Sequence, residues 1–222
     1  MSEFAQFFAL SFSALFPLIN PLGSSLVFMG MVGITTGNVY KTLARKIAIT
    51  TALFLIAMDV GGAAVLKAFG ISLPIVQLAG GLVVAAMGWV LLNQKEASAT
   101  ADPATITGDL SELQRKIFYP FTFPLTAGPG VLVVTLTLSA HASKGALSHI
   151  LFAQAGVVAG MVLNCALVFL AYAFAPRITA RISPSTAHGI LRVVAFVLLC
   201  IGAQIAWNGL SSLIEGLSHV HR

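Results

Sequence analysis

Two clusters of proline and glycine interrupt apolar stretches that would otherwise form continuous membrane helices. They read FPLINPLG at residues 16–23 and FPLTAGPG at residues 123–130, and both fit the pattern FPL, four residues, G at an offset of 107 (16 to 123). Proline removes a backbone donor and clashes with the preceding turn, and glycine lowers helix propensity. Each cluster therefore predicts a helix that breaks inside the membrane.

A broken helix offers backbone groups that can do chemistry. The first half ends in unpaired carbonyls, and the second half begins with unpaired N–H groups and about half a positive charge. Two breaks that meet would hold an anion at the N–H groups and a cation at the carbonyls, which suits a zwitterion. No Lys or Arg lies near either cluster, and the neighbours are apolar. A small neutral amino acid fits this site better than a phosphate or a nucleotide does.

Several side chains at the breaks could contact such a ligand. Ser24 can cap the second half-helix or bind the ligand, and Pro129 suits a first helical position. Gly128 and Gly130 let a ligand approach the backbone. The predicted binding residues are Asn20, Pro21, Gly23, Ser24, Thr126, Gly128, Pro129 and Gly130. The alternative is that both clusters are simple kinks, because proline is common in membrane helices.

Asp59 lies inside the second apolar stretch. An acid at membrane depth is by default a functional candidate, and here it could carry a coupling proton or help to hold Na⁺. The alternative is that Asp59 lies near the end of its helix and pairs with Lys67. Histidines occur only at helix ends or tails, without metal spacing inside the membrane, so we expect no metal and no cofactor beyond the coupling ion.

The composition excludes several classes of protein. Of 222 residues, 58% are hydrophobic and 9% are charged, whereas soluble domains carry roughly 25% charged residues. The chain is therefore expected to be integral to the lipid bilayer. Basic residues do not interleave with aromatic ones, so a nucleic-acid partner is not expected. The sequence contains no GxSxG, HExxH, paired carboxylates or Walker loop, so we expect neither an enzyme nor an ATP-driven pump.

The apolar stretches predict an all-α membrane protein with six transmembrane segments, since a span needs about 20 residues. They cover residues 4–33, 43–66, 73–92, 117–140, 149–173 and 188–217. A polar linker at 93–116 separates a first repeat at 1–92 from a second at 117–222. Three spans per half invert the second half, so two inverted three-helix repeats with broken first and fourth helices are predicted. Residues 81–85 (GLVVA) and 191–195 (LRVVA) are only weakly alike.

Lys and Arg predict the orientation of the chain, because they accumulate on the cytoplasmic side. The loops after the first, third and fifth spans hold eight of them, against three on the other side. The eight are Lys41, Arg45, Lys46, Lys95, Arg115, Lys116, Arg177 and Arg181, so both termini should be periplasmic. An aromatic belt is expected at the cytoplasmic ends from Tyr40, Trp89, Tyr119 and Tyr172.

Small residues predict where helices approach closely. Gly156 and Gly160 form GxxxG in the fifth span, and Gly80, Gly81, Ala85 and Gly88 form a small-residue face on the third. Such faces let helix backbones touch in lipid. We expect them to pack within the chain, which leaves an oligomer open. The isolated amides Gln77, Asn164, Gln204 and Asn208 are expected to bond between helices.

The motifs together resemble the MarC family of bacterial inner-membrane proteins. The resemblance rests on residues 15–23 and 69–92 in the first half and on residues 123–130 and 192–210 in the second. Its most specific parts are NPLG at 20–23 and TAGPG at 126–130. It implies six spans in two inverted repeats, and transport of glycine and alanine as in the SnatA-like branch. It also implies binding by Asn20, Pro21, Gly23, Thr126, Gly128, Pro129 and Gly130.

The sequence thus predicts a secondary transporter of small neutral amino acids in the bacterial inner membrane. Substrate would bind between the two breaks, and access would alternate between the two sides. Alternatives are an exporter of drugs or other small metabolites, a channel, and a membrane scaffold without substrate. Saturable flux would favour a transporter, whereas unsaturable conductance would favour a channel.

Overall fold

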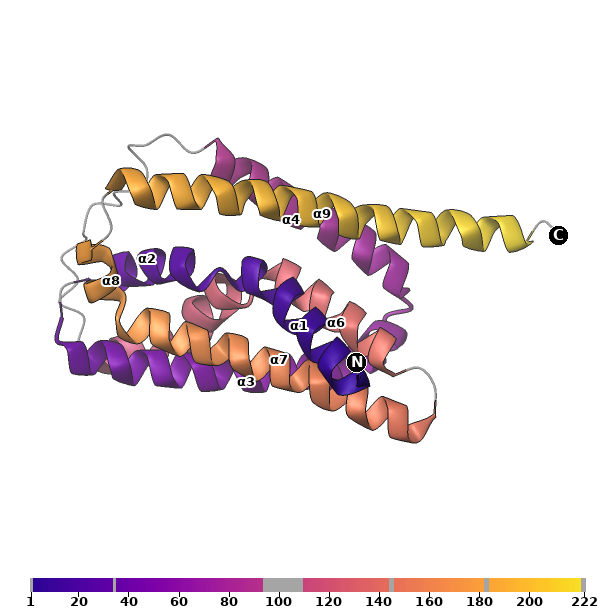
Figure 1. The fold of residues 1–222 in the computed structure, drawn as a ribbon, viewed down its shortest axis with the longest axis horizontal. Helices are drawn as coiled ribbons and strands as arrows, with labels where there is room; N and C mark the ends of the chain where they lie inside the picture. The colour runs from indigo at the N-terminus through magenta and orange to yellow at the C-terminus, as the bar shows by residue number, and fades with distance from the viewer. Residues whose placement is uncertain (1, 34, 94–109, 144–145, 182–183, 221–222) are drawn as a thin grey trace.

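The computed structural model describes residues 2–33, 35–93, 110–143, 146–181 and 184–220, and within these ranges it contains helices and no strand (Figure 1). The helices are α1 (Glu3–Ile19), α2 (Pro21–Val32), α3 (Gly37–Ala68), α4 (Leu73–Leu92), α5 (Leu110–Arg115), η2 (Ile117–Thr126), α6 (Pro129–Ala142), α7 (Leu147–Ala173), α8 (Ala175–Arg181) and α9 (Pro184–Val220). The all-α prediction is therefore confirmed for the described residues.

Five helical stretches among the described residues are long and apolar enough to cross a membrane. They are Glu3–Val32, Gly37–Ala68, Leu73–Leu92, Leu147–Ala173 and Gly189–Gly216. The pair η2 and α6 makes a sixth if it is one span, although it bends by 72°. The chain is thus a multi-pass membrane protein with five or six apolar spans. The predicted linker at 93–116 lies largely outside the described residues, and its end forms α5.

Both helix breaks occur at the predicted residues. The first helix stops at Ile19 and resumes at Pro21, and the later one stops at Thr126 and resumes at Pro129. Two further residues, Tyr119 and Phe123, have extended backbone angles inside η2. Each precedes a proline, whose ring disfavours the helical conformation of the residue before it. Proline chemistry therefore explains why η2 is irregular while α6 is not.

Helices α4 and α9 lie side by side along much of their length (Figure 1). A Cβ added to Gly81 would lie 2.3 Å from the Ala206 nitrogen, and one added to Gly202 would lie 2.3 Å from the Ala85 nitrogen. The two helices are therefore antiparallel, and their backbones touch without intervening side chains. We call this the glycine seam. Gly88 and Gly209 extend it, each facing backbone atoms of the other helix.

The small residues of the other faces also pack inside the chain. A Cβ on Gly156 would lie 2.5 Å from the Phe4 carbonyl, and one on Gly160 would lie 2.7 Å from Ser11, so GxxxG packs against α1. Gly80 faces Val133 of α6. Asn164 bonds from α7 to the Phe12 carbonyl at 3.4 Å, and Gln77 bonds from α4 to Thr137 at 3.3 Å. Gln204, in contrast, donates to Asn208 within α9 at 2.8 Å, so the prediction of a hydrogen bond between helices is wrong for these two residues.

The core of the described chain surrounds α7, which packs against α1, α2 and α3. Phe28 of α2 is fully buried there, with its ring stacked on that of Tyr172 at 4.4 Å. Phe28 also meets the rings of Tyr40 and Phe121 edge-on, at 5.9 and 5.3 Å. Aromatic pairs in these geometries contribute beyond the area they bury. This cluster therefore fixes α2, α3, η2 and α7 beside the two breaks.

Candidate functional site

Asn20 lies at the first break, between α1 and α2. It adopts a left-handed conformation (φ 45°, ψ 67°), which ends α1 and lets α2 start at Pro21. Its side-chain oxygen accepts the N–H of Gly23 at 3.1 Å, so Asn20 is also the cap of α2. Its carbonyl accepts the hydroxyl of Ser24 at 2.9 Å. The predicted residues Asn20, Pro21, Gly23 and Ser24 thus form one hydrogen-bonded turn, in which Ser24 is not the cap.

The same turn leaves two carbonyls of α1 without their usual partners. In a continuous helix, Pro17 and Ile19 would each accept the N–H of the residue four positions later. Pro21 has no N–H, and the N–H of Gly23 bonds to the side chain of Asn20 instead. These two carbonyls form the negative pole of the first break.

The second break has the opposite character at its restart. Gly128 precedes α6 in an extended conformation, Pro129 is the first helical residue, and no described side chain caps the helix. The N–H groups of Val131 and Leu132 donate to the Gly128 carbonyl and Pro129 has none, so the N–H of Gly130 is the donor left open at the positive end of α6 among the described residues. Before the break, the hydroxyl of Thr126 donates to the Phe121 carbonyl at 2.6 Å. The carbonyl of Pro124 lies 3.1 Å from where a Cβ of Gly128 would be.

Tyr172, at the end of α7, connects the two breaks. Its hydroxyl lies 2.9 Å from that of Thr126 and faces the side chain of Ser24, while its ring stacks on Phe28 of α2 at 4.4 Å. Thr126 and Tyr172 are fully buried, and Ser24 is 7% exposed. A Cβ on Gly130 would lie 3.3 Å from the Leu18 side chain, which is a second contact between the breaks. The structure therefore brings the residues predicted at the first break together with those predicted at the second.

Helix α4 forms a wall of this site. A Cβ on Gly130 would lie 2.3 Å from Val84, and one on Gly128 would lie 4.0 Å from Met87. The wall is apolar, so the polar groups available to a ligand are the backbone of the breaks and the hydroxyls around Tyr172. Such an arrangement suits a small ligand with two opposite charges and little side chain.

Asp59 lies apart from this turn, on α3. It is 5% exposed, and its carbonyl accepts the hydroxyl of Ser139, on α6, at 2.7 Å. Its carboxylate oxygen Oδ1 has no hydrogen-bond partner among the described residues. No ion pair joins Asp59 to Lys67 in the described part of the chain. An unpaired carboxylate in this position is expensive to keep charged, which keeps Asp59 a candidate for binding a proton or a cation.

Three threonines add buried polar atoms that the sequence analysis does not single out. The hydroxyls of Thr51, Thr122 and Thr135 are fully buried and have no partner among the described residues. Thr51 lies on the same face of α3 as Asp59, eight residues away, and Thr135 lies one turn before Ser139 on α6. Unpaired polar groups at membrane depth are costly. Thr51 of α3 and Thr135 of α6 thus add unpaired polar atoms near Asp59 and Ser139, whereas Thr122 belongs to η2.

The predicted aromatic belt is wrong for two of its four members. Tyr40 is 2% exposed and donates to the Gly33 carbonyl at 2.7 Å, and Tyr172 is fully buried in the core. Trp89 and Tyr119 are exposed at 58% and 67%. Tyr172 is thus the site residue that the sequence analysis misses, because a position near a helix end favours an interfacial role by default.

The fold and the two breaks define a polytopic α-helical membrane protein with interrupted spans. The sequence model of the MarC family of integral membrane proteins matches residues 5–214, so the chain belongs to this family. It is 27% identical over 207 residues to the UPF0056 membrane protein YvbG of Bacillus subtilis, covering 93% of this chain and 95% of the relative. It is 25% identical over 232 residues to the UPF0056 inner membrane protein MarC of Salmonella arizonae, covering 97% and 99%. No solved structure matches.

Proposed function

We propose that this chain is a secondary transporter of small neutral amino acids, of the glycine and alanine class. Substrate would bind between the two helix breaks, and the protein would open alternately to the two sides of the membrane. The observation that carries the proposal is the contact of Tyr172 with Ser24 at one break and Thr126 at the other. Two interrupted helices that meet are the best pointer to a transporter's binding site.

The glycine seam supports two inverted repeats, at residues 1–92 and 117–222. Residues 81–88 and 202–209 both read G-x-x-x-A-x-x-G, at an offset of 121 (81 to 202). Gly81 meets Gly202 and Ala206, while Gly202 meets Gly81 and Ala85, so each helix presents the same surface to the other. Matching contacts of this kind are what a two-fold axis between the halves produces. The weak sequence similarity between residues 81–85 and 191–195 does not correspond to these contacts.

The two poles at the breaks support a zwitterionic substrate. The uncapped start of α6 at Gly128, Pro129 and Gly130 would receive the carboxylate, since helix N-termini favour anions. The ammonium would meet the carbonyls of Pro17 and Ile19, which lack their usual partners. The wall formed by Val84 and Met87 leaves room for little more than a small side chain.

Asp59 is the proposed coupling residue, with H⁺ or Na⁺ as its ion. Its buried, unpaired carboxylate oxygen is the observation in favour. We also propose the bacterial inner membrane as the location, with both termini periplasmic, from the Lys and Arg distribution. The relative from Salmonella arizonae is described as an inner membrane protein, which agrees with this location.

The test is flux of labelled glycine and alanine into proteoliposomes, with and without gradients of H⁺ and Na⁺. Gly128→Val should abolish saturable flux, because its side chain would press on the Pro124 carbonyl, 3.1 Å from the added Cβ, and cover the backbone at the start of α6. The matched control is Gly30→Val on α2, where an added Cβ has no neighbour within 4 Å. Gly130 is unsuitable, because its Cβ would collide with Val84 at 2.3 Å and disturb the fold.

Each outcome of this test selects a class of function. Saturable flux that is lost in Gly128→Val and kept in Gly30→Val supports the transporter. Unsaturable conductance would favour a channel, and saturable flux of other compounds would favour an exporter of drugs or metabolites. No flux of any kind from folded protein would favour a scaffold.

A further inference from the structure

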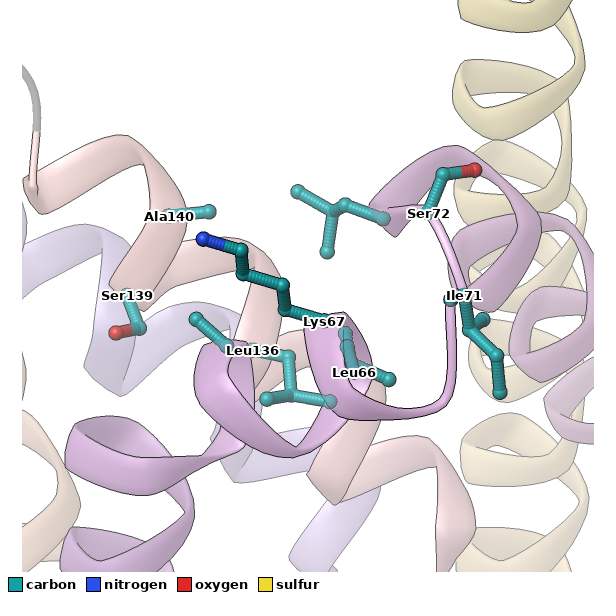
Figure 2. Close-up of a pocket in the computed structure, with 10 residues that line it drawn as sticks. Leu66, Lys67, Ile71, Ser72, Leu136, Ser139 and Ala140 are labelled. Atoms are coloured by element: carbon teal, nitrogen blue, oxygen red, sulfur yellow. The ribbon is translucent and has the colours of Figure 1, made fainter.

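A cavity of about 370 Å³ lies away from the two breaks, where α3 ends, the chain turns into α4, and α6 ends. Figure 2 shows Lys67 reaching from the end of α3 across this space toward Ala140, with Ser139 below and Ser72 on the far side. Most of the lining is apolar, including Leu66 and Leu136. The ammonium of Lys67 is therefore the main polar feature of a concave site, in the size range of small-molecule pockets.

Lys67 has no acidic partner within the described ranges. The ion pairs recorded there join Lys116 to Glu112 and His149 to Glu3. The turn that follows, through Gly70 to Ser72, adds no charge of its own. An ammonium at the mouth of an apolar cavity favours an anionic group, and Lys forms strong, charge-assisted hydrogen bonds with carboxylates and with phosphates.

The floor of the cavity leads to a buried acid. Ser139 lines the cavity, and its hydroxyl donates to the Asp59 carbonyl at 2.7 Å. Asp59, Ala63 and Lys67 lie four residues apart on α3 and therefore share one face of the helix. The unpartnered oxygen of Asp59, together with the buried hydroxyl of Thr135 one turn before Ser139, continues the polar atoms inward from the cavity.

We propose that this cavity is an outer subsite, in which Lys67 holds the carboxylate of a small zwitterionic amino acid before it reaches the breaks. The proposal rests on the proposed transport function. The Lys67 ammonium would hold the negative end of this ligand, and Asp59, which does not itself line the cavity, lies about two turns further along the same face of α3. The polar atoms of α3 and α6 would then form a path for the ligand or its coupling ion from the cavity to the second break.

The experiment measures glycine uptake by proteoliposomes made of neutral lipid, with the chain oriented so that the end of α3 faces the outside. Lys67→Met keeps the length of the side chain and removes the charge, and Lys67→Arg keeps the charge. Lys41→Met is the matched control, because Lys41 lies at the opposite end of the same helix, near the Phe174 ring at 6.0 Å.

The expected result is a rise of about tenfold in the KM for external glycine in Lys67→Met, since a charge-assisted contact is lost. The maximal rate of Lys67→Met should stay near that of the wild type. Lys67→Arg and Lys41→Met should keep a KM near the wild-type value. An unchanged KM in Lys67→Met, with wild-type flux intact, would overturn the subsite and leave the proposed function standing. Absence of saturable flux in the wild type would remove both.

A second arm separates the substrate carboxylate from a lipid phosphate, which the same ammonium could bind. The KM measurements are repeated in vesicles that contain an anionic phospholipid. If Lys67→Met changes transport only in those vesicles, the cavity binds a lipid headgroup and the subsite is wrong. If the KM rises equally in neutral vesicles, the carboxylate of the substrate is the ligand.

Discussion

The hydroxyl oxygens of Tyr172 and Thr126 lie 2.9 Å apart, which ties the end of α7 to the second helix break. The Tyr172 hydroxyl also faces Ser24, beside the first break, and its ring stacks on Phe28 of α2 at 4.4 Å. Movement of either break relative to the other must therefore change the surroundings of this one hydroxyl. It is the natural first target for mutation.

Tyr172→Phe should lower the maximal rate of glycine flux and reduce the free energy of unfolding by about 1 kcal/mol, the typical net contribution of a hydrogen bond. The ring and its stack on Phe28 would remain, so the effect isolates the hydroxyl. Flux assays and thermal unfolding in detergent check both effects. Tyr119→Phe is the control, because that side chain is 67% exposed. Equal flux in both variants would mean that the hydroxyl does not connect the breaks functionally.

Gly81→Ala and Gly202→Ala should destabilise the protein by similar amounts, about 1–3 kcal/mol each, the usual range for overpacking. Each new methyl would lie 2.3 Å from a backbone nitrogen of the other helix, which forces α4 and α9 apart. The double variant should lose less than the sum, because the helices need to separate only once. Thermal unfolding measures all three, with Gly30→Ala as the unhindered control. Strict additivity would contradict a shared seam.

Asp59→Asn should abolish the stimulation of glycine uptake by an ion gradient, while exchange of glycine without a gradient continues. The amide keeps the shape of the side chain and removes the group that would take up a proton or bind Na⁺. Uptake and counterflow in the same proteoliposomes separate the two activities. Glu112→Gln is the control, since Glu112 is paired with Lys116 at 2.8 Å on an exposed helix. Gradient-driven uptake that survives Asp59→Asn would assign coupling to another residue.

Thiol labelling should place the two ends of α3 on opposite sides of the membrane. In a Cys200→Ser background, which removes the exposed native thiol, Ser72→Cys should react with an impermeant maleimide on intact cells. Thr36→Cys should react only after the cells are permeabilised, because the Lys and Arg bias assigns that end to the cytoplasm. The opposite pattern would reverse the proposed orientation, and with it the side from which the Lys67 cavity opens.

The sequence predicts the positions of both breaks because proline and glycine act on their immediate neighbours. Pro21 and Pro129 start new helices wherever the rest of the chain lies, so no knowledge of tertiary contacts is needed. The choice of Asn20 as the cap, in place of Ser24, depends on a left-handed backbone that residue type alone does not dictate. Local chemistry was therefore enough for the breaks, but not for their internal hydrogen bonds.

Tyr172 and the glycine seam could not be predicted in the same way. The burial of Tyr172 depends on Phe28, which is 144 residues away in the chain (172 minus 28). The seam matches the halves at an offset of 121, whereas the FPL motifs match at 107, because the second half has the extra helix α8 and a longer start of α9 before its glycines. If the two halves are aligned at one fixed offset, either the FPL motifs or the glycine motifs of the seam are matched, but not both.

The side chain of Asn20 makes the two breaks unequal as receptors for an anion. Its amide oxygen already accepts the N–H of Gly23, so a side chain of the protein takes the place of an anion at the first break. No described side chain does so at the start of α6. An arriving carboxylate would therefore dock on α6 without competition and would have to evict Asn20 to engage α2. Binding of an anion at the first break would therefore exchange one ligand of the Gly23 N–H for another, whereas binding at α6 would add a ligand.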